Sequence, residues 1–136
     1  MGIEENKAVV RRLVDDFLSK HDLAAADDIF SEGLIDHQGA VTTTGRENVK
    51  QFVGGLFQAF PDLQFEIGHL IAEGEKVCIN VIGRGTHRGD FRGVAPTGRA
   101  VTILGTSIVR IADGRIAERW NITDMAGLMQ QLEPAE

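Results

Sequence analysis

The 136-residue chain contains no tyrosine, and it has only one cysteine, one tryptophan and three prolines. The single cysteine, Cys78, excludes an internal disulfide and fits a reducing compartment, so we expect a cytoplasmic protein. No apolar run approaches the roughly 20 residues of a membrane span. The first residues also lack the basic start and apolar stretch of a secretory signal. We therefore expect no membrane partner.

Positive charge is also scarce, since the chain carries a net charge of −6. This balance argues against general nucleic-acid binding, which needs clustered basic residues to neutralise phosphates. Between Arg84 and Arg119, however, seven arginines stand against three acidic residues. The interpretation we favour is the solvated face of a sheet, and the alternative is a mild attraction for a carboxylate. The expected partner is an apolar or carboxylate-bearing small molecule.

The spacing of apolar residues changes halfway along the chain. In the first half it is helical, which predicts helices near residues 4–18, 22–33 and 44–60, with a brief extended segment at 34–37. From Leu63 the period is two, which predicts strands over 63–71, 77–86, 100–111 and 115–123, with Asp113-Gly114 as a hairpin turn. A short helix over 125–132 follows. We expect one α+β domain spanning residues 1–136, in which helices pack on a curved antiparallel sheet and enclose an apolar pocket.

The sequence contains no motif for a cofactor or a metal. Gly83-Arg84-Gly85 lies in strand sequence without a following helix, so it lacks the geometry of a dinucleotide-binding turn. The four histidines have no metal-ligand spacing, and one cysteine cannot build a zinc cluster. We expect neither a cofactor nor a metal.

Asp124 is the first candidate for a catalytic residue. Alternation through Ile116, Trp120 and Ile122 places it on the face of the tryptophan, where an apolar lining would desolvate the carboxylate and make it a stronger base. The alternative is structural, because Asp124 directly precedes the last predicted helix and could serve as its N-cap.

The second candidate is His87, which continues an apolar strand face and would lie at the cavity mouth, unless it is an exposed histidine at a strand end. Either Asp36 or His37 must point inward if their segment lines the pocket, and we favour His37. Ser107 is a candidate lining hydroxyl. The remaining predicted pocket residues are Val81, Ile103, Trp120 and Ile122, and Trp120 fits packing better than substrate stacking.

Several short motifs, in order along nearly the whole chain, carry a resemblance to a known family. They are Glu5-Asn6-Lys7, His21-Asp22-Leu23, Asp36-His37, Ala59-Phe60-Pro61-Asp62-Leu63, Gly85-Thr86-His87-Arg88-Gly89, Pro96-Thr97-Gly98-Arg99, and the ending Trp120, Asp124, Gly127-Leu128 and Gln130-Gln131-Leu132. The chain resembles the SnoaL-like polyketide cyclase family. The resemblance implies a nuclear-transport-factor-2-like (cystatin-like) fold, which is a cone of curved sheet and helices around a pocket. Proteins with this fold commonly dimerise through the sheet.

The resemblance also implies a reaction. Cyclases of this kind close a polyketide ring by intramolecular aldol condensation without metal or cofactor, and an aspartate at the position of Asp124 serves as acid/base. A neutral donor such as His87 or His37 would stabilise the enolate oxygen. The absence of tyrosine removes the most obvious second donor.

The wider fold also hosts isomerases and non-catalytic domains, so two functions stay open. One is a cofactor-free lyase or isomerase of the cyclase type. The other is a ligand-binding or dimeric scaffold domain without chemistry. An epoxide hydrolase would need a second inward carboxylate beside Asp124, and the sequence argues against it.

Overall fold

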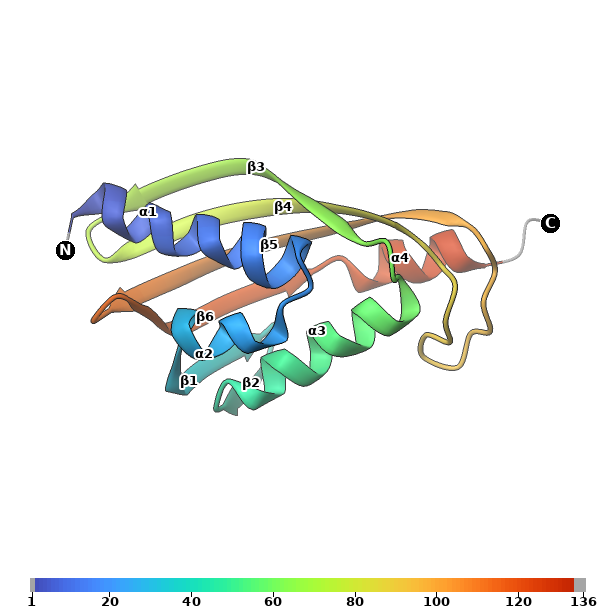
Figure 1. The fold of residues 1–136 in the computed structure, drawn as a ribbon, viewed down its shortest axis with the longest axis horizontal. Helices are drawn as coiled ribbons and strands as arrows, with labels where there is room; N and C mark the ends of the chain where they lie inside the picture. Colours follow the sequence, from blue (N-terminus) through green and yellow to red (C-terminus); the bar gives the residue numbers. More distant parts are fainter. Residues whose placement is uncertain (1, 134–136) are drawn as a thin grey trace.

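The computed structural model describes residues 2–133 and places one curved sheet against a layer of helices (Figure 1). The helical segments are α1 (Ile3–Arg12), its π-helical continuation η1 (Leu13–Ser19), the 3₁₀ turn η2 (Leu23–Ala25), α2 (Ala26–Ile29), α3 (Glu47–Ala59) and α4 (Met125–Leu132). The strands are β1 (Phe30–Gln38), β2 (Val41–Thr44), β3 (Gln64–Glu73), β4 (Lys76–Thr86), β5 (Ala100–Ala112) and β6 (Arg115–Thr123). The predicted α+β class is confirmed.

The strands are ordered β2-β1-β6-β5-β4-β3, and every neighbouring pair is antiparallel except β1 and β6, which run parallel. The four strands from β3 to β6 form the predicted meander, and Asp113-Gly114 makes the predicted turn with positive φ at both residues. The brief extended segment predicted at 34–37 belongs to a nine-residue strand, β1, and places residues from the first third of the chain beside the last strand.

The first predicted helix, near residues 4–18, is confirmed by α1 and η1, but the second is shorter than predicted. The expected helix over 22–33 ends at Ile29, because β1 begins at Phe30 and takes up the rest of that segment. The Asp22 side chain makes no capping hydrogen bond. None of the helices within residues 2–133 is both long enough and apolar enough to cross a membrane.

Strand β6 contains one extra residue, Ala117. Ile116 pairs with Ile111, but the next pair along the ladder joins Glu118 to Arg110, so Ala117 has no partner and forms a β-bulge. Because successive side chains of a strand point to opposite faces, one extra residue reverses the faces of all residues that follow.

The bulge overturns the predicted alternation from Ile116 to Asp124. Ile116 is fully buried on the helix-covered inner face, whereas Trp120 is 36% exposed and Ile122 is 61% exposed on the outer face. The residues between them, Arg119 and Asn121, are buried on the inner face. Regular alternation, which ignores the bulge, assigns the second half of β6 to the wrong faces of the sheet.

Two apolar clusters hold the helices on the inner face of the sheet. The larger cluster lies under α1 and α2 and includes the buried residues Val10, Phe17 and Phe30. The smaller lies under the end of α3 and under α4 and includes Phe60 and Leu128. The space between the helices and the sheet is therefore filled at both ends, and the cavity described next lies along α3.

Candidate functional site

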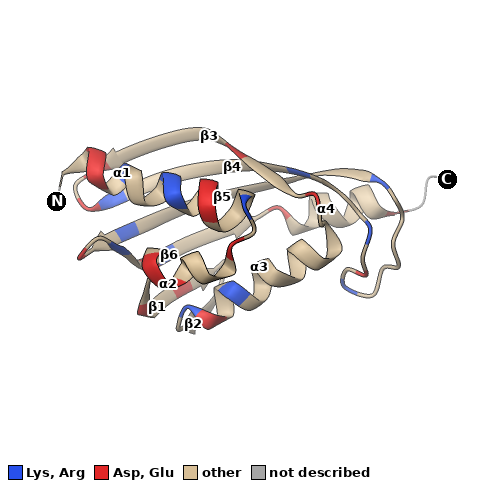
Figure 2. Cartoon of the chain, viewed as in Figure 1, with Lys and Arg blue, Asp and Glu red and all other residues tan. Residues whose placement is uncertain are grey.

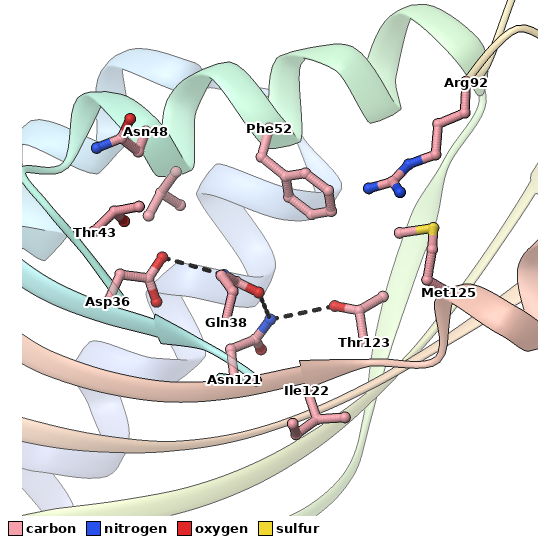
Figure 3. A pocket seen from close by; sticks show the side chains of 12 residues that line it. Asp36, Gln38, Thr43, Asn48, Phe52, Arg92, Asn121, Ile122, Thr123 and Met125 are labelled. Carbon is pink, nitrogen blue, oxygen red and sulfur yellow. Dashed lines mark hydrogen bonds between the residues drawn. The ribbon is translucent and has the colours of Figure 1, made fainter. Parts of the chain in front are cut away.

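A cavity of about 420 Å³ opens between α3, the ends of β1 and β6, and the start of α4. Its two walls differ in character (Figure 3). Val49, Phe52 and Met125 form an apolar wall. The facing wall is polar and is formed by Asp36, Gln38, Asn121 and Thr123. A cavity therefore lies between α3 and the sheet, and one side of it is polar.

A narrower extension of about 60 Å³ shares Phe52, Asn121 and Thr123 with the main cavity. Val81 and Ile103, two of the predicted pocket residues, line this extension. The others on its lining are Leu18, Val53, Leu56, Phe65, Gly105 and Arg119. An apolar portion of a ligand would therefore fit toward the interior, beyond the polar wall.

The polar wall is built on an ion pair between β1 and β6. Arg119 donates from Nε to Oδ1 of Asp36 at 2.9 Å and from Nη2 to Oδ2 at 2.8 Å. The two residues are direct register partners in the parallel ladder, and the side chain of Asp36 is 2% exposed and that of Arg119 is 9% exposed. Such a bidentate pair fixes the carboxylate on the cavity wall.

Amide side chains extend this pair along the wall. Gln38 donates from Nε2 to Oδ2 of Asp36 at 3.1 Å, and Asn121 donates from Nδ2 to Oε1 of Gln38 at 2.9 Å. Asn121 Nδ2 also donates to the Thr123 hydroxyl at 3.2 Å, while the Ser107 hydroxyl donates to Asn121 Oδ1. The predicted lining hydroxyl of Ser107 is thus buried behind Asn121, and Thr123 stands nearer the opening.

Asp124 does not occupy the apolar lining expected for it. Its side chain is exposed, and Oδ1 accepts a hydrogen bond from the Gly127 amide at 2.9 Å, so the residue caps α4. The expected desolvation is therefore wrong, because the bulge at Ala117 and the start of the helix turn this carboxylate to solvent. Its role as a base stays a prediction. Its contacts are those of the alternative interpretation, a helix N-cap.

His87 does not lie at the cavity mouth. It is fully buried beside Phe60, with ring centroids 5.6 Å apart. Its Nδ1 accepts a hydrogen bond from the Thr97 amide at 3.2 Å and lies 3.0 Å from the Thr97 hydroxyl. Nε2 is buried without a partner within residues 2–133. His87 follows the inner face as expected, but the loop that returns to β5 covers it.

His37 and Trp120 lie on the outer face, stacked at 5.4 Å between ring centroids. The preference for His37 over Asp36 as the inward residue is wrong, because Asp36 is the one that faces the cavity. His37 contacts Glu118 instead, at 2.8 Å from Nε2 to Oε2. This hydrogen bond, with a smaller contribution from Arg110, lowers the pKa of Glu118 below its ordinary value.

Ile122 borders the cavity through its position on β6, but its side chain points away from the polar wall (Figure 3). Gln38 and Asn121 were not among the predicted site residues, and Arg92 and Arg119 entered only within the group of seven arginines between Arg84 and Arg119. Only Asp36 gave a signal, as one of the two residues of which one had to face inward. Arginine and asparagine are rarely buried, and nothing local indicates their partners on β1.

Charged residues are sparse along the two helices that border the cavity (Figure 2). Helix α4 has no charged residue, and α3 has only Glu47 and Lys50, near its start. Arg92, in the loop between β4 and β5, extends over the open side toward Phe52 and Met125 (Figure 3). Within residues 2–133, no three His, Cys, Asp or Glu side chains converge as a metal site would require.

Comparison with known proteins gives consistent results. A family model described as SnoaL-like polyketide cyclase matches residues 8–132. Among solved structures, AclR from Streptomyces galilaeus, described as a "putative hydroxylase", is 28% identical with a TM-score of 0.88, covering 96% of this chain and 97% of its own. IdmH from Streptomyces antibioticus, described as a "putative polyketide cyclase", is 26% identical with a TM-score of 0.81, covering 93% and 97%.

A SnoaL-like protein from Jannaschia sp. CCS1 shares the fold at 24% identity, with a TM-score of 0.87 over 100% of this chain and 97% of its own. No curated protein sequence matches the chain. The nuclear-transport-factor-2-like fold that the sequence motifs implied is confirmed by these neighbours.

Proposed function

Because the chain belongs to the SnoaL-like polyketide cyclase family, we propose that it acts on an apolar, carbonyl-bearing small molecule in the cavity along α3, by cofactor-free lyase or isomerase chemistry. The observation that carries the proposal is a carboxylate, Asp36, held almost without solvent contact on the wall of that cavity. In this proposal Asp36, in place of Asp124, is the acid/base.

The contacts of Asp36 leave one acceptor site of the carboxylate free to take up a proton. Arg119 occupies one lone-pair site on each carboxylate oxygen and Gln38 occupies a second on Oδ2, which leaves Oδ1 with a free site. A proton on a carbon between two carbonyl groups would be taken up there, and the resulting enolate would attack a further carbonyl of the same molecule. Asp36 would then return the proton to the alkoxide that forms, which restores the carboxylate.

A hydroxyl takes the place of the missing tyrosine as the donor to the enolate oxygen. Thr123 already accepts a hydrogen bond from Asn121 Nδ2, so its own proton is free to point into the cavity. A neutral donor held in position by its neighbours stabilises negative charge as it develops and needs little rearrangement.

The second candidate function is ligand binding without chemistry. It is favoured by the same network, because three of the four lone-pair sites on the Asp36 carboxylate are engaged inside the protein. A carboxylate so engaged acts as a fixed part of the wall. Under this alternative, ligands bind and leave unchanged.

The test is exchange of the acidic α-proton in deuterated water, followed by mass spectrometry with aromatic 1,3-diketones and β-keto esters as probes. We expect the wild-type protein to accelerate exchange and Asp36→Asn to lose about 10²- to 10⁴-fold of that acceleration. Asp124→Asn is the matched control, because asparagine caps a helix as well as aspartate does. Circular dichroism verifies that both variants are folded.

Each outcome separates the hypotheses. Loss of exchange in Asp124→Asn but not in Asp36→Asn would return the catalytic role to the residue predicted from the sequence. Binding of the probes with no exchange above the uncatalysed rate would establish the alternative, ligand binding without chemistry.

We further propose that two copies of the chain associate through the outer face of the sheet. Support comes from the large apolar side chains exposed there, which include Leu104, Ile108, Trp120 and Ile122. Exposed apolar residues that gather on one face commonly mark a protein interface. In such a dimer both cavities would stay open on the opposite, helical side.

A further inference from the structure

The loop between β4 and β5 contains a tight hairpin turn that includes an arginine. Phe91 and Val94 exchange two backbone hydrogen bonds of 3.0 and 2.9 Å, and the two residues between them, Arg92 and Gly93, have φ of 48° and 83°. Positive φ at both central positions is the pattern of a type I′ turn, in which Asn-Gly and Asp-Gly are strongly preferred. Arginine at the first position is therefore a locally unfavourable choice.

The rest of the loop fixes this turn in place. The amides of Arg88 and Gly89 both donate to the carbonyl of Ala59, at 2.9 and 3.1 Å. A Cβ on Gly89 would lie 2.4 Å from the Gln58 carbonyl oxygen, so only glycine permits this close approach to the end of α3. Phe91 is 7% exposed and packs against Phe60 at 5.4 Å between ring centroids. The turn is thus anchored on the N-terminal side of Arg92.

Arg92 supplies the uncompensated charge of the cavity. Of the charged residues on the lining, Asp36 and Arg119 neutralise each other through two hydrogen bonds. Arg92 makes no ion pair within residues 2–133, and its guanidinium lies over the open side near Phe52 and Met125 (Figure 3). The cavity therefore has one surplus positive charge at its mouth, in a chain whose net charge is −6.

From these observations we propose that Arg92 is a specificity-determining residue that binds a single carboxylate on an otherwise apolar ligand. The planar guanidinium fork matches a carboxylate in a bidentate geometry. The apolar body of the ligand would rest on Phe52 and Met125 and extend toward Val81 and Ile103. The strained position of Arg92 has a functional reason in this arrangement, since backbone strain of this kind concentrates at ligand sites.

This inference shares its cavity with the proposed function and deepens it by naming the charge of the ligand. The test compares two probes of the same shape, 2-naphthoate and 2-naphthamide, by isothermal titration calorimetry. We expect the wild-type protein to bind 2-naphthoate about tenfold more tightly, which is the order of effect of one charge-assisted hydrogen-bonded pair.

Arg92→Asn is the decisive variant, because asparagine suits a positive φ and removes the guanidinium. It should bind both probes equally, at the wild-type affinity for the amide, and its melting temperature should be equal to or above that of the wild type. Arg88→Asn is the matched control, since Arg88 is an exposed arginine of the same loop that does not line the cavity. It should keep the tenfold preference.

Preference for 2-naphthoate that survives in Arg92→Asn overturns the inference, and so does equal or absent binding of the two probes to the wild type. The α-proton exchange assay on the wild type separates this result from the proposed function. If the protein accelerates exchange but shows no preference for the carboxylate, only the proposed role of Arg92 is refuted. If it prefers the carboxylate but does not accelerate exchange, only the acid/base role of Asp36 is refuted.

Discussion

The two faces of strand β6 reverse the usual distribution of polar and apolar residues. On the inner face, Arg119 and Asn121 are each 8% exposed, and both are hydrogen-bonded to side chains of β1. On the outer face, Trp120 and Ile122 are exposed to solvent. A strand that only supported the fold would have the opposite pattern. The reversal is what we expect if the inner face binds a ligand and the outer face binds a second copy of the chain, as proposed above.

The largest effect should come from breaking the inner ion pair. We expect Asp36→Ala to lower the free energy of unfolding by about 3–5 kcal/mol, because it leaves the Arg119 guanidinium buried without its partner. The measurement is equilibrium unfolding in urea.

The outer pair of Arg84 and Glu66 is the control, since both side chains are more than half exposed. Glu66→Ala should cost at most about 1 kcal/mol. The double variant Asp36→Leu with Arg119→Met should recover most of the loss, because it removes both charges together. Equal costs for the inner and the outer pair would contradict the distinction between the two faces.

The next effect concerns the outer face. We expect Ile122→Arg to weaken self-association about 100-fold, since it places a charge in the middle of the apolar surface of β5 and β6. Sedimentation equilibrium measures the dissociation constant. Arg11→Glu, an exposed charge reversal on α1, should leave it unchanged. A wild-type protein that stays monomeric at high concentration would remove the dimer and leave the exposed apolar residues without a partner.

A smaller effect tests whether Asp124 only caps α4 or has a further role. As an N-cap, Asp124→Ala should lower the free energy of unfolding by about 1 kcal/mol and Asp124→Asn by only a few tenths. Thermal unfolding of the two variants beside the wild type measures the difference. If Asp124→Asn costs as much as Asp124→Ala, the carboxylate has a role beyond capping.

The smallest effect is the acid sensitivity of the outer face. The pKa of Glu118 in the folded protein lies below its ordinary value of 4.5, so its contribution to stability is present above that value and is lost as the pH falls through the lower, folded-state pKa. Glu118→Gln lacks this contribution. The gap in melting temperature between wild type and variant should therefore narrow as the pH falls below 4.5, and a constant gap would contradict the assignment.

The sequence predicted the elements whose signal is local. The period-two runs of β3 to β5 and the turn at Asp113-Gly114 are properties of consecutive residues, and the structure has them where they were expected. Strand β1 was underestimated because Ser31-Glu32-Gly33 breaks its alternation and resembles a helix end followed by a loop. Its hydrogen bonds with β6, far along the chain, make this segment a strand.

The site was predicted less well because its residues depend on pairing between distant strands. Val81 and Ile103 follow from alternation within regular strands, and both line the cavity. Asp36 could be recognised only as half of an either-or choice, since nothing in the first forty residues indicates Arg119. The bulge at Ala117 has no sequence signature, because alanine fits a regular strand position as readily as it fits a bulge. It decides, however, that Asn121 faces the cavity and that Trp120 does not.

The parallel ladder between β1 and β6 also sets an order of events during synthesis. Asp36 and Arg119 are separated by 83 positions, so the polar wall cannot form until the segment that carries Arg119 has left the ribosome. Contacts of such long range close late and slow folding, because a large loop must be ordered first. Until then β1 has an unpaired edge that can join other chains. The polar wall of the cavity and the protection of this strand edge therefore arise in the same step.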